Sequence, residues 1–147
     1  MYRIGLDLGS TTIKAVVVDS EGNALFDKYI RHNAKVYEVL FDVIDEIVDV
    51  VGEEAETSLA VTGSVGMGIA EKCEIPFVQE VVAATKAIAH KGLCVNTMID
   101  IGGEDAKVVF FNEDGATEDL RMNGNCSGGT GAFIDQMAII LGEDIDK

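Results

Sequence analysis

Hydrophobic and polar residues alternate over the first stretch of the chain. The alternation over residues 2–8 is the period of a half-buried strand, and it predicts a strand there. Residues 13–19 and 24–31 are predicted as the second and third strands, because short turns rich in glycine and small polar residues separate them. The pattern therefore predicts an antiparallel three-stranded meander.

The hydrophobic period changes after residue 35. From Val36 to Val51 apolar residues recur at intervals of three and four. The other face carries five acidic residues, Glu38, Asp42, Asp45, Glu46 and Asp49. This pattern predicts an amphipathic helix that ends near Gly52. Its acidic face is interpreted as a solvated surface.

The remainder of the chain repeats the order of the beginning. Further elements are predicted in this sequence: a strand at 58–62, a glycine-rich turn at 63–68, a short helix to Glu74, a helix at 78–91, strands at 93–101, 106–111 and up to Met122, and a helix at 130–141. The strand at 93–101 is apolar enough to be a central strand of the main sheet. Strand, glycine turn, strand, turn, strand and helix thus occur twice, which indicates an internal structural repeat.

Composition excludes several classes of protein. The chain has 147 residues, of which 48% are hydrophobic, so it is long enough to bury a core. It carries 26 Asp and Glu against 11 Lys and Arg, which argues against nucleic acid and anionic membranes as partners. No signal peptide and no apolar run of roughly 20 residues is present, so a cytoplasmic location is expected. Cys73 and Cys94 are interpreted as buried thiols rather than parts of a disulfide framework.

Two glycine turns each follow an acidic residue at a strand end, in the same place of each repeat. They are Asp7-Leu8-Gly9-Ser10-Thr11-Thr12 and Asp100-Ile101-Gly102-Gly103-Glu104-Asp105. Backbone N–H groups and hydroxyls of such turns can cradle phosphate oxygens, while a carboxylate holds Mg²⁺. The pair predicts a nucleotide-phosphate site in which Asp7 and Asp100 are the catalytic, Mg²⁺-holding carboxylates. The candidate phosphate contacts are Gly9, Ser10, Thr11, Thr12, Lys14, Gly102, Gly103 and Glu104. For Lys14, a surface lysine on the second strand is an equal alternative.

Cys126 stands among glycines at 124, 128, 129 and 131, just before the predicted helix at 130–141. The free N–H groups and the positive end of a helix dipole favour the thiolate, which binds metal or attacks an electrophile. The glycines leave room for a bulky anionic group near the sulfur. A buried structural cysteine in a turn is an equal alternative on this stretch alone.

At these motifs the sequence resembles a known family. The two turns look like the phosphate motifs of the actin, Hsp70 and sugar-kinase superfamily. More narrowly, four segments resemble the ATP-dependent activases of 2-hydroxyacyl-CoA dehydratases and benzoyl-CoA reductases, especially their large members. These segments are Thr62-Gly63-Ser64, Phe77-Val78-Gln79-Glu80-Val81, Gly102-Gly103-Glu104-Asp105-Ala106-Lys107 and residues 121–138.

The resemblance implies an α/β fold: a ribonuclease-H-like, actin-like ATPase with a mixed sheet flanked by helices. Residues 1–92 would form the first such unit and residues 93–147 the beginning of a second, truncated one. It further implies ATP or ADP and Mg²⁺ as ligands. A [4Fe–4S] cluster would be shared between the subunits of a homodimer, with Cys126 as one ligand. The partner would be an acyl-CoA dehydratase or reductase that receives a low-potential electron.

The chain departs from the implied pattern at its end. The cluster needs a second cysteine per subunit, and no cysteine follows Cys126. A fragment of a longer protein is therefore expected, one that binds nucleotide weakly, holds no stable cluster alone and leaves apolar surface of its last helix uncovered.

Two other classes of protein stay open. A small-molecule kinase would need the phosphate turns and a substrate base, for which Glu80 and Asp105 are candidates. An actin-like binding module would use ATP without any metal cluster. His32 and His90 are interpreted as ordinary surface or capping histidines, because neither has a partner at metal-ligand spacing.

Overall fold

The computed structural model describes residues 1–123 and 130–143 of an α/β protein. The chain divides into two compact units, Met1–Ala83 and Ala84–Lys147, with the division inside a helix. The elements are β1 (Tyr2–Leu8), β2 (Thr12–Val18), β3 (Ala24–Arg31), α1 (Val36–Val51), β4 (Thr57–Thr62), α2 (Gly66–Cys73), α3 (Glu80–His90), β5 (Thr97–Ile101), β6 (Ala106–Phe111), β7 (Thr117–Met122) and α4 (Gly131–Leu141). The division into ribonuclease-H-like units at residue 92 stays a prediction.

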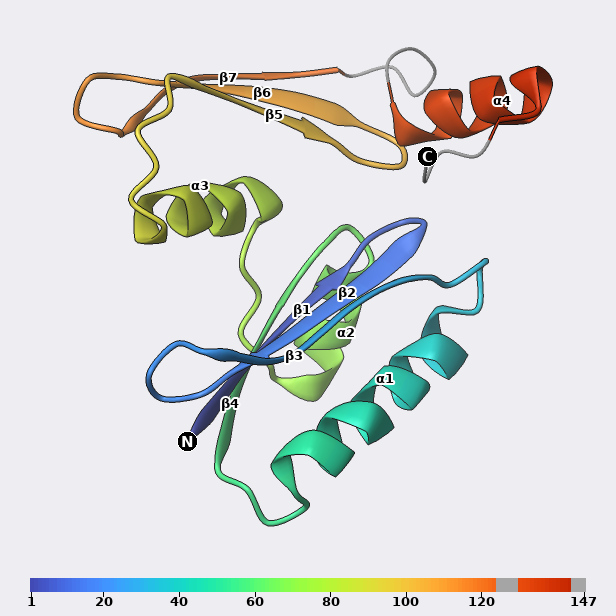
Figure 1. The fold of residues 1–147 in the computed structure, drawn as a ribbon, viewed down its shortest axis with the longest axis vertical. Coiled ribbons are helices and arrows are strands. Elements are labelled where there is room, and N and C mark those ends of the chain that lie inside the picture. Colours follow the sequence, from blue (N-terminus) through green and yellow to red (C-terminus); the bar gives the residue numbers. More distant parts are fainter. Residues whose placement is uncertain (124–129, 144–147) are drawn as a thin grey trace. The chain divides into compact units, whose positions relative to one another are not determined.

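The first unit is built on a mixed sheet with the strand order β3-β2-β1-β4. The first three strands form the predicted antiparallel meander, and β4 pairs with β1 in parallel. A parallel neighbour requires a crossover connection, which α1 supplies. In Figure 1, α1 lies along one face of this sheet. The predicted mixed sheet flanked by helices is confirmed.

The core of the first unit lies between α1 and the sheet. The buried stripe of α1 is Leu40, Val43 and Ile47, spaced by three and four residues as the sequence pattern predicts. Together with buried residues of the strands, such as Leu8 and Val17, they form one hydrophobic cluster. Each Å² of apolar surface removed from water stabilises the fold by about 25 cal/mol. The burial of these side chains therefore holds in place the sheet that carries the first glycine turn.

The second unit contains a separate antiparallel sheet with the order β5-β6-β7. The prediction that residues 93–101 form a central strand of the main sheet is wrong. The strand begins at Thr97, and within the described residues it has one neighbour, β6. Ile99 is therefore 67% exposed, although its apolar character resembles that of a central strand.

The two units repeat one hairpin in the same register. Asp7 pairs with Lys14 between β1 and β2, and Asp100 pairs with Lys107 between β5 and β6. The turns close alike, because the Gly9 N–H donates to the Thr12 carbonyl at 3.0 Å and the Gly102 N–H to the Asp105 carbonyl at 2.8 Å. Each hairpin continues into a third strand and a helix, so the predicted repeat is confirmed for the described residues.

Three predictions of burial are wrong. Cys73 and Cys94 are exposed, because one ends α2 and the other lies in the connection between α3 and β5. His32 is only 3% exposed, since the end of β3 brings it against the first glycine turn. His90 is exposed in the last turn of α3, as expected.

The last helix, α4, exposes most of its apolar side chains. Ile139, Ile140 and Leu141 are each more than 70% exposed, and no residue of α4 is buried. The expectation of uncovered apolar surface on this helix is confirmed. Within the described residues, no helix is long and apolar enough to cross a membrane.

Candidate functional site

The first glycine turn joins β1 to β2 and gathers the candidate residues of the first unit. Asp7 is the second-last residue of β1, residues 9–11 form the turn, and Thr12 begins β2 with its side chain buried. Ser10 and Thr11 are partly exposed. The structure thus brings together, at one end of the sheet, the carboxylate, the hydroxyls and the backbone amides that the sequence predicted.

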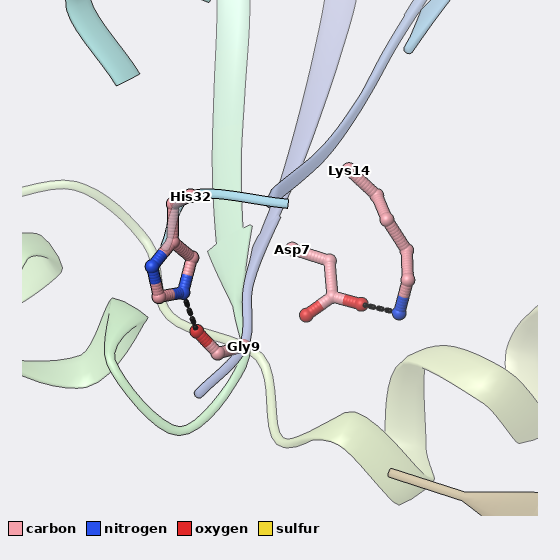
Figure 2. A network of polar contacts seen from close by, with 4 residues as sticks. All are labelled: Asp7, Gly9, Lys14 and His32. Atoms are coloured by element: carbon pink, nitrogen blue, oxygen red, sulfur yellow. Dashed lines mark hydrogen bonds and ion pairs between the residues drawn. The ribbon is translucent and has the colours of Figure 1, made fainter. Parts of the chain in front are cut away.

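Asp7 and Lys14 form an ion pair across the two strands. Lys14 Nζ donates to Asp7 Oδ2 at 2.8 Å (Figure 2). The ammonium also lies 5.8 Å from the centroid of the Tyr29 ring, within cation–π range. Lys14 is half exposed on β2, as a surface lysine would be, and its ammonium lies beside the Asp7 carboxylate, as a phosphate contact would require. Both alternatives for Lys14 therefore stay open.

His32 contacts the same turn from another direction. Its Nε2 lies 3.2 Å from the carbonyl oxygen of Gly9 (Figure 2). Its backbone N–H donates to the Thr11 carbonyl at 3.2 Å. The sequence analysis missed this residue. The 23 residues that separate His32 from Gly9 leave no local pattern that would reveal the contact.

Gly63 brings a second loop against the end of β1. It has a φ of 96°, and a Cβ at this position would lie 2.4 Å from the Leu8 carbonyl oxygen. The loop is fixed by the Val65 N–H, which donates to the same carbonyl at 2.9 Å. Only glycine fits both the backbone conformation and the space, so Gly63 allows the segment Thr62-Gly63-Ser64 to lie beside the first turn.

The second glycine turn gathers the candidate residues of the second unit. Asp100 is in β5, and Gly102, Gly103 and the exposed Glu104 form the turn. In this turn Lys107, which is 5% exposed, binds Asp105 with an Nζ–Oδ2 distance of 2.8 Å. Asp105 is thus paired with a buried lysine, although its own side chain is 33% exposed, and this pairing weakens its candidacy as a substrate base.

The N-terminus of α4 is tied to the second turn. The Gly131 N–H donates to the Gly102 carbonyl at 2.8 Å, and the Ala132 N–H to the Gly103 carbonyl at 3.2 Å. The next two amides donate to the Thr130 carbonyl. The first four amides of α4 therefore already have acceptors, and they are not the free donors that the argument for a Cys126 thiolate assumed.

Cys126 lies outside the described residues, so its role stays a prediction. Within residues 1–123 and 130–143, no group of three or more His, Cys, Asp or Glu side chains is placed to hold a metal ion. Mg²⁺ commonly takes only one or two carboxylates, with water and phosphate as its other ligands. The arrangement at Asp7 is compatible with that mode of binding.

Comparison with known proteins gives the family. The sequence profile described as the BadF/BadG/BcrA/BcrD ATPase family matches residues 4–147. The chain belongs to the BadF/BadG/BcrA/BcrD ATPase family. Among its relatives, the activator of lactoyl-CoA dehydratase from Anaerotignum propionicum is 28% identical over 148 residues, which are 100% of this chain and 56% of the relative. The (R)-2-hydroxyglutaryl-CoA dehydratase activating ATPase from Acidaminococcus fermentans is 30% identical over 147 residues, which are 96% of this chain and 54% of the relative.

Solved structures agree with the family. The activator of 2-hydroxyisocaproyl-CoA dehydratase from Clostridium difficile, with bound ADPNP, matches with a TM-score of 0.79 and 27% identity, over 98% of this chain and 53% of that one. Component A of the Acidaminococcus fermentans (R)-2-hydroxyglutaryl-CoA dehydratase also matches with a TM-score of 0.79, at 25% identity, over 98% and 55%. The chain spans about half the length of these relatives.

Proposed function

We propose that this chain is the nucleotide-binding part of an ATP-hydrolysing activator of an acyl-CoA dehydratase or reductase. The observation that carries the proposal is the repeated hairpin: each unit places a strand-end carboxylate and a glycine turn in the same register. The family match and the ADPNP-bound relative with the same fold support nucleotide as the ligand.

In the first unit, the phosphates would lie against the turn at residues 9–12. The turn amides other than that of Gly9, which donates to Thr12, and the hydroxyls of Ser10 and Thr11 are donors suited to phosphate oxygens. Asp7 would hold Mg²⁺, since its carboxylate already attracts the Lys14 ammonium. Bound together with the phosphates, Mg²⁺ supplies neutralisation of their charge during hydrolysis. Lys14 would then turn from Asp7 to a phosphate oxygen.

In the second unit, the turn would contact nucleotide through N–H groups other than that of Gly102, which donates to Asp105, while the carbonyls of Gly102 and Gly103 hold α4. The two bonds from Gly131 and Ala132 make the position of α4 depend on the conformation of this turn. A change in the turn between ATP-bound and ADP-bound protein would therefore shift the N-terminus of α4. That link gives the chain a physical route from the nucleotide to Cys126, five residues before α4.

We further propose Cys126 as a ligand of a [4Fe–4S] cluster shared between two subunits. A cluster of this kind supplies a one-electron centre for the partner enzyme. The proposal rests on the sequence around Cys126 and on the resemblance. Of the other cysteines, Cys73 belongs to the first unit and Cys94 to the second, and both are exposed. They serve as internal controls.

The kinase alternative receives no support from the site. Asp105, one of its two candidate substrate bases, is held by Lys107, and the role of Glu80 stays a prediction.

The experiment that tests nucleotide binding is calorimetric titration of the intact protein with ADPNP and Mg²⁺. Wild type is compared with Asp7→Asn and with Asp42→Asn, which removes the same charge from the exposed face of α1. We expect Asp7→Asn to weaken binding at least tenfold, about 1.4 kcal/mol, and to reduce its dependence on Mg²⁺. Asp42→Asn should bind like wild type. Equal binding by all three proteins would contradict the proposed role of Asp7.

The cluster is tested separately, by anaerobic reconstitution with iron and sulfide of the longer protein that the resemblance implies, because no second cysteine follows Cys126 in this chain. Absorption and electron paramagnetic resonance spectra are compared for wild type, Cys126→Ser and Cys94→Ser, and the mass of each protein is measured by light scattering. We expect a cluster in a dimer for wild type and Cys94→Ser, and its loss in Cys126→Ser. If none of the three proteins holds iron and all bind ATP, Cys126 has a structural role.

A further inference from the structure

His32 lies behind the first glycine turn and is nearly inaccessible. The residue is 3% exposed, and it directly follows β3 in the segment that leads to α1. A histidine buried to this extent must have its polar atoms accounted for, because a buried donor or acceptor without a partner destabilises the fold.

The two ring nitrogens of His32 differ. Nε2 lies 3.2 Å from the Gly9 carbonyl oxygen. A carbonyl can only accept, so Nε2 carries the proton in this contact. Nδ1 is buried and has no hydrogen-bond partner among the residues that the structure describes. An apolar side chain could fill the same space without leaving a buried nitrogen unpaired. What the imidazole adds over such a side chain is therefore its hydrogen bond to Gly9.

The backbone of His32 contacts the turn as well. Its N–H donates to the Thr11 carbonyl at 3.2 Å, and the turn itself contributes one internal bond, from Gly9 to Thr12. Of these three bonds, two come from His32. The next residues, Asn33 and Ala34, have φ values of 47° and 64°, left-handed conformations that asparagine tolerates but that cost free energy for alanine. The chain is bent so that His32 meets the turn.

The bond to Gly9 sets the direction of a neighbouring amide. In a trans peptide, the C=O and the N–H point in opposite directions, and no cis peptide occurs among the described residues. With the Gly9 carbonyl turned to His32, the Ser10 N–H is turned away from it. In Figure 2, His32 and the Asp7 carboxylate lie on opposite sides of the β1 backbone.

From this geometry we infer that His32 is a positioning residue for the phosphate turn. It holds the Gly9–Ser10 peptide so that the Ser10 N–H is presented to an incoming phosphate without prior rearrangement. Donors fixed in advance bind more tightly than donors that must be ordered on binding. The inference rests on the proposed function, because it assumes that a nucleotide phosphate binds this turn.

The test compares two amide variants of the intact protein. In His32→Gln, the side-chain amide can reach the position of Nε2 and donate to Gly9. In His32→Asn, the amide is one methylene shorter and reaches only the position of Nδ1. His90→Gln is the matched control, because His90 is the other histidine of the chain and is exposed. Affinity for ADPNP with Mg²⁺ is measured by calorimetry, at a temperature below the unfolding transition of every variant.

We expect His32→Gln to bind within about threefold of wild type and His32→Asn to bind roughly tenfold more weakly, the loss of one hydrogen bond's contribution. His90→Gln should not differ from wild type. If wild type binds ADPNP and the Gln and Asn variants have equal affinities, the positioning role of His32 is overturned while the proposed function stands. A wild type that does not bind ADPNP would overturn the proposed function and this inference with it.

A second measurement needs no variant. In a long-range ¹H–¹⁵N spectrum of the wild type, His32 is expected to show its proton on Nε2, and the signal should shift when ADPNP is added. A proton on Nδ1 in the free protein, or a signal that saturating ADPNP leaves in place, would overturn the inference.

Discussion

Lys14 and Asp7 face each other across β1 and β2, with 2.8 Å between Nζ and Oδ2, at the register position that Lys107 and Asp100 share in the second unit. The two lysines nevertheless differ. The Lys14 side chain is 49% exposed, whereas that of Lys107 is 7% exposed and binds Asp105. Exposed ion pairs contribute little to stability, so Lys14 can leave Asp7 at low cost.

Lys14→Met is therefore expected to affect binding more than stability. If Lys14 moves from Asp7 to a phosphate oxygen when nucleotide binds, its loss should weaken ADPNP binding about tenfold, the size of a charge-assisted hydrogen bond. Calorimetric titration measures this effect, and thermal unfolding should change little. Lys86→Met, which removes the same charge from an exposed position of α3, is the control. Unchanged nucleotide affinity in Lys14→Met would show that Lys14 serves Asp7 alone.

Gly131→Ala should loosen the link between α4 and the second turn. A Cβ on residue 131 would lie 3.0 Å from the Gly102 carbonyl oxygen, the acceptor of the Gly131 N–H. Alanine stabilises a helix by up to ~1 kcal/mol relative to glycine, but here we expect the contact to cancel that gain. Hydrogen exchange of the amides of residues 131 and 132 should become faster.

Gly68→Ala is the matched control for this change. Gly68 lies in α2, and a Cβ there would meet nothing within 4 Å among the described residues. This variant should be more stable than wild type by ~0.5–1 kcal/mol. Equal stabilisation by both substitutions, with unchanged exchange at residue 131, would mean that the turn adapts and that α4 is not held by close contact.

The sequence was sufficient where the information is local. The period of α1 and the alternation in β1 appear within a few residues, and the structure has both elements within a residue of their predicted bounds. The glycine turns were recognisable as well, because their residue types are those that phosphate binding requires. The repeat was visible only as an order of elements, since the equal registers of the two hairpins depend on pairing.

What the sequence could not give depends on contacts between distant residues. His32 resembles a surface residue, and only the position of β3 beside the turn buries it. The apolar stretch before Ile101 resembles a central strand, but a strand's position in a sheet is set by its neighbours. Cys94 has apolar neighbours in sequence and yet lies on an exposed connection. In each case, the local pattern determines the element and the tertiary structure determines the burial.

Gly63→Ala should destabilise the first unit strongly. Its φ of 96° disfavours any side chain, and the new Cβ would lie 2.4 Å from the Leu8 carbonyl oxygen. Gly22 has a similar φ of 92° with nothing within 4 Å of a Cβ among the described residues, so Gly22→Ala isolates the conformational cost. We expect ~1 kcal/mol for Gly22→Ala and more than ~3 kcal/mol for Gly63→Ala in urea unfolding. Equal losses would show that the loop at Gly63 can move away from β1.

Asp19 makes the turn between β2 and β3 sensitive to pH. The side-chain amide of Asn23 and then its backbone N–H hold the pKa of the Asp19 carboxyl below its ordinary value of 3.8. In the second unit, Asn112 occupies the same place, and its Oδ1 accepts from the amides of Asp114 and Ala116. An uncharged acceptor therefore suffices for this turn, and the charge of Asp19 adds only the part that depends on pH.

Asp19→Asn is expected to remove that part. A pKa lowered by folding stabilises the protein fully above the unfolded value of about 4 and ceases to do so as pH falls through the folded value. The difference in unfolding free energy between wild type and Asp19→Asn should thus be constant from pH 7 to about pH 5. Below about pH 4, wild type should lose stability relative to the variant. Urea unfolding over this range measures it, with Asp42→Asn as a charge-matched control on α1. A difference that stays the same at every pH would show that the Asp19 carboxylate is not stabilised by its hydrogen bonds.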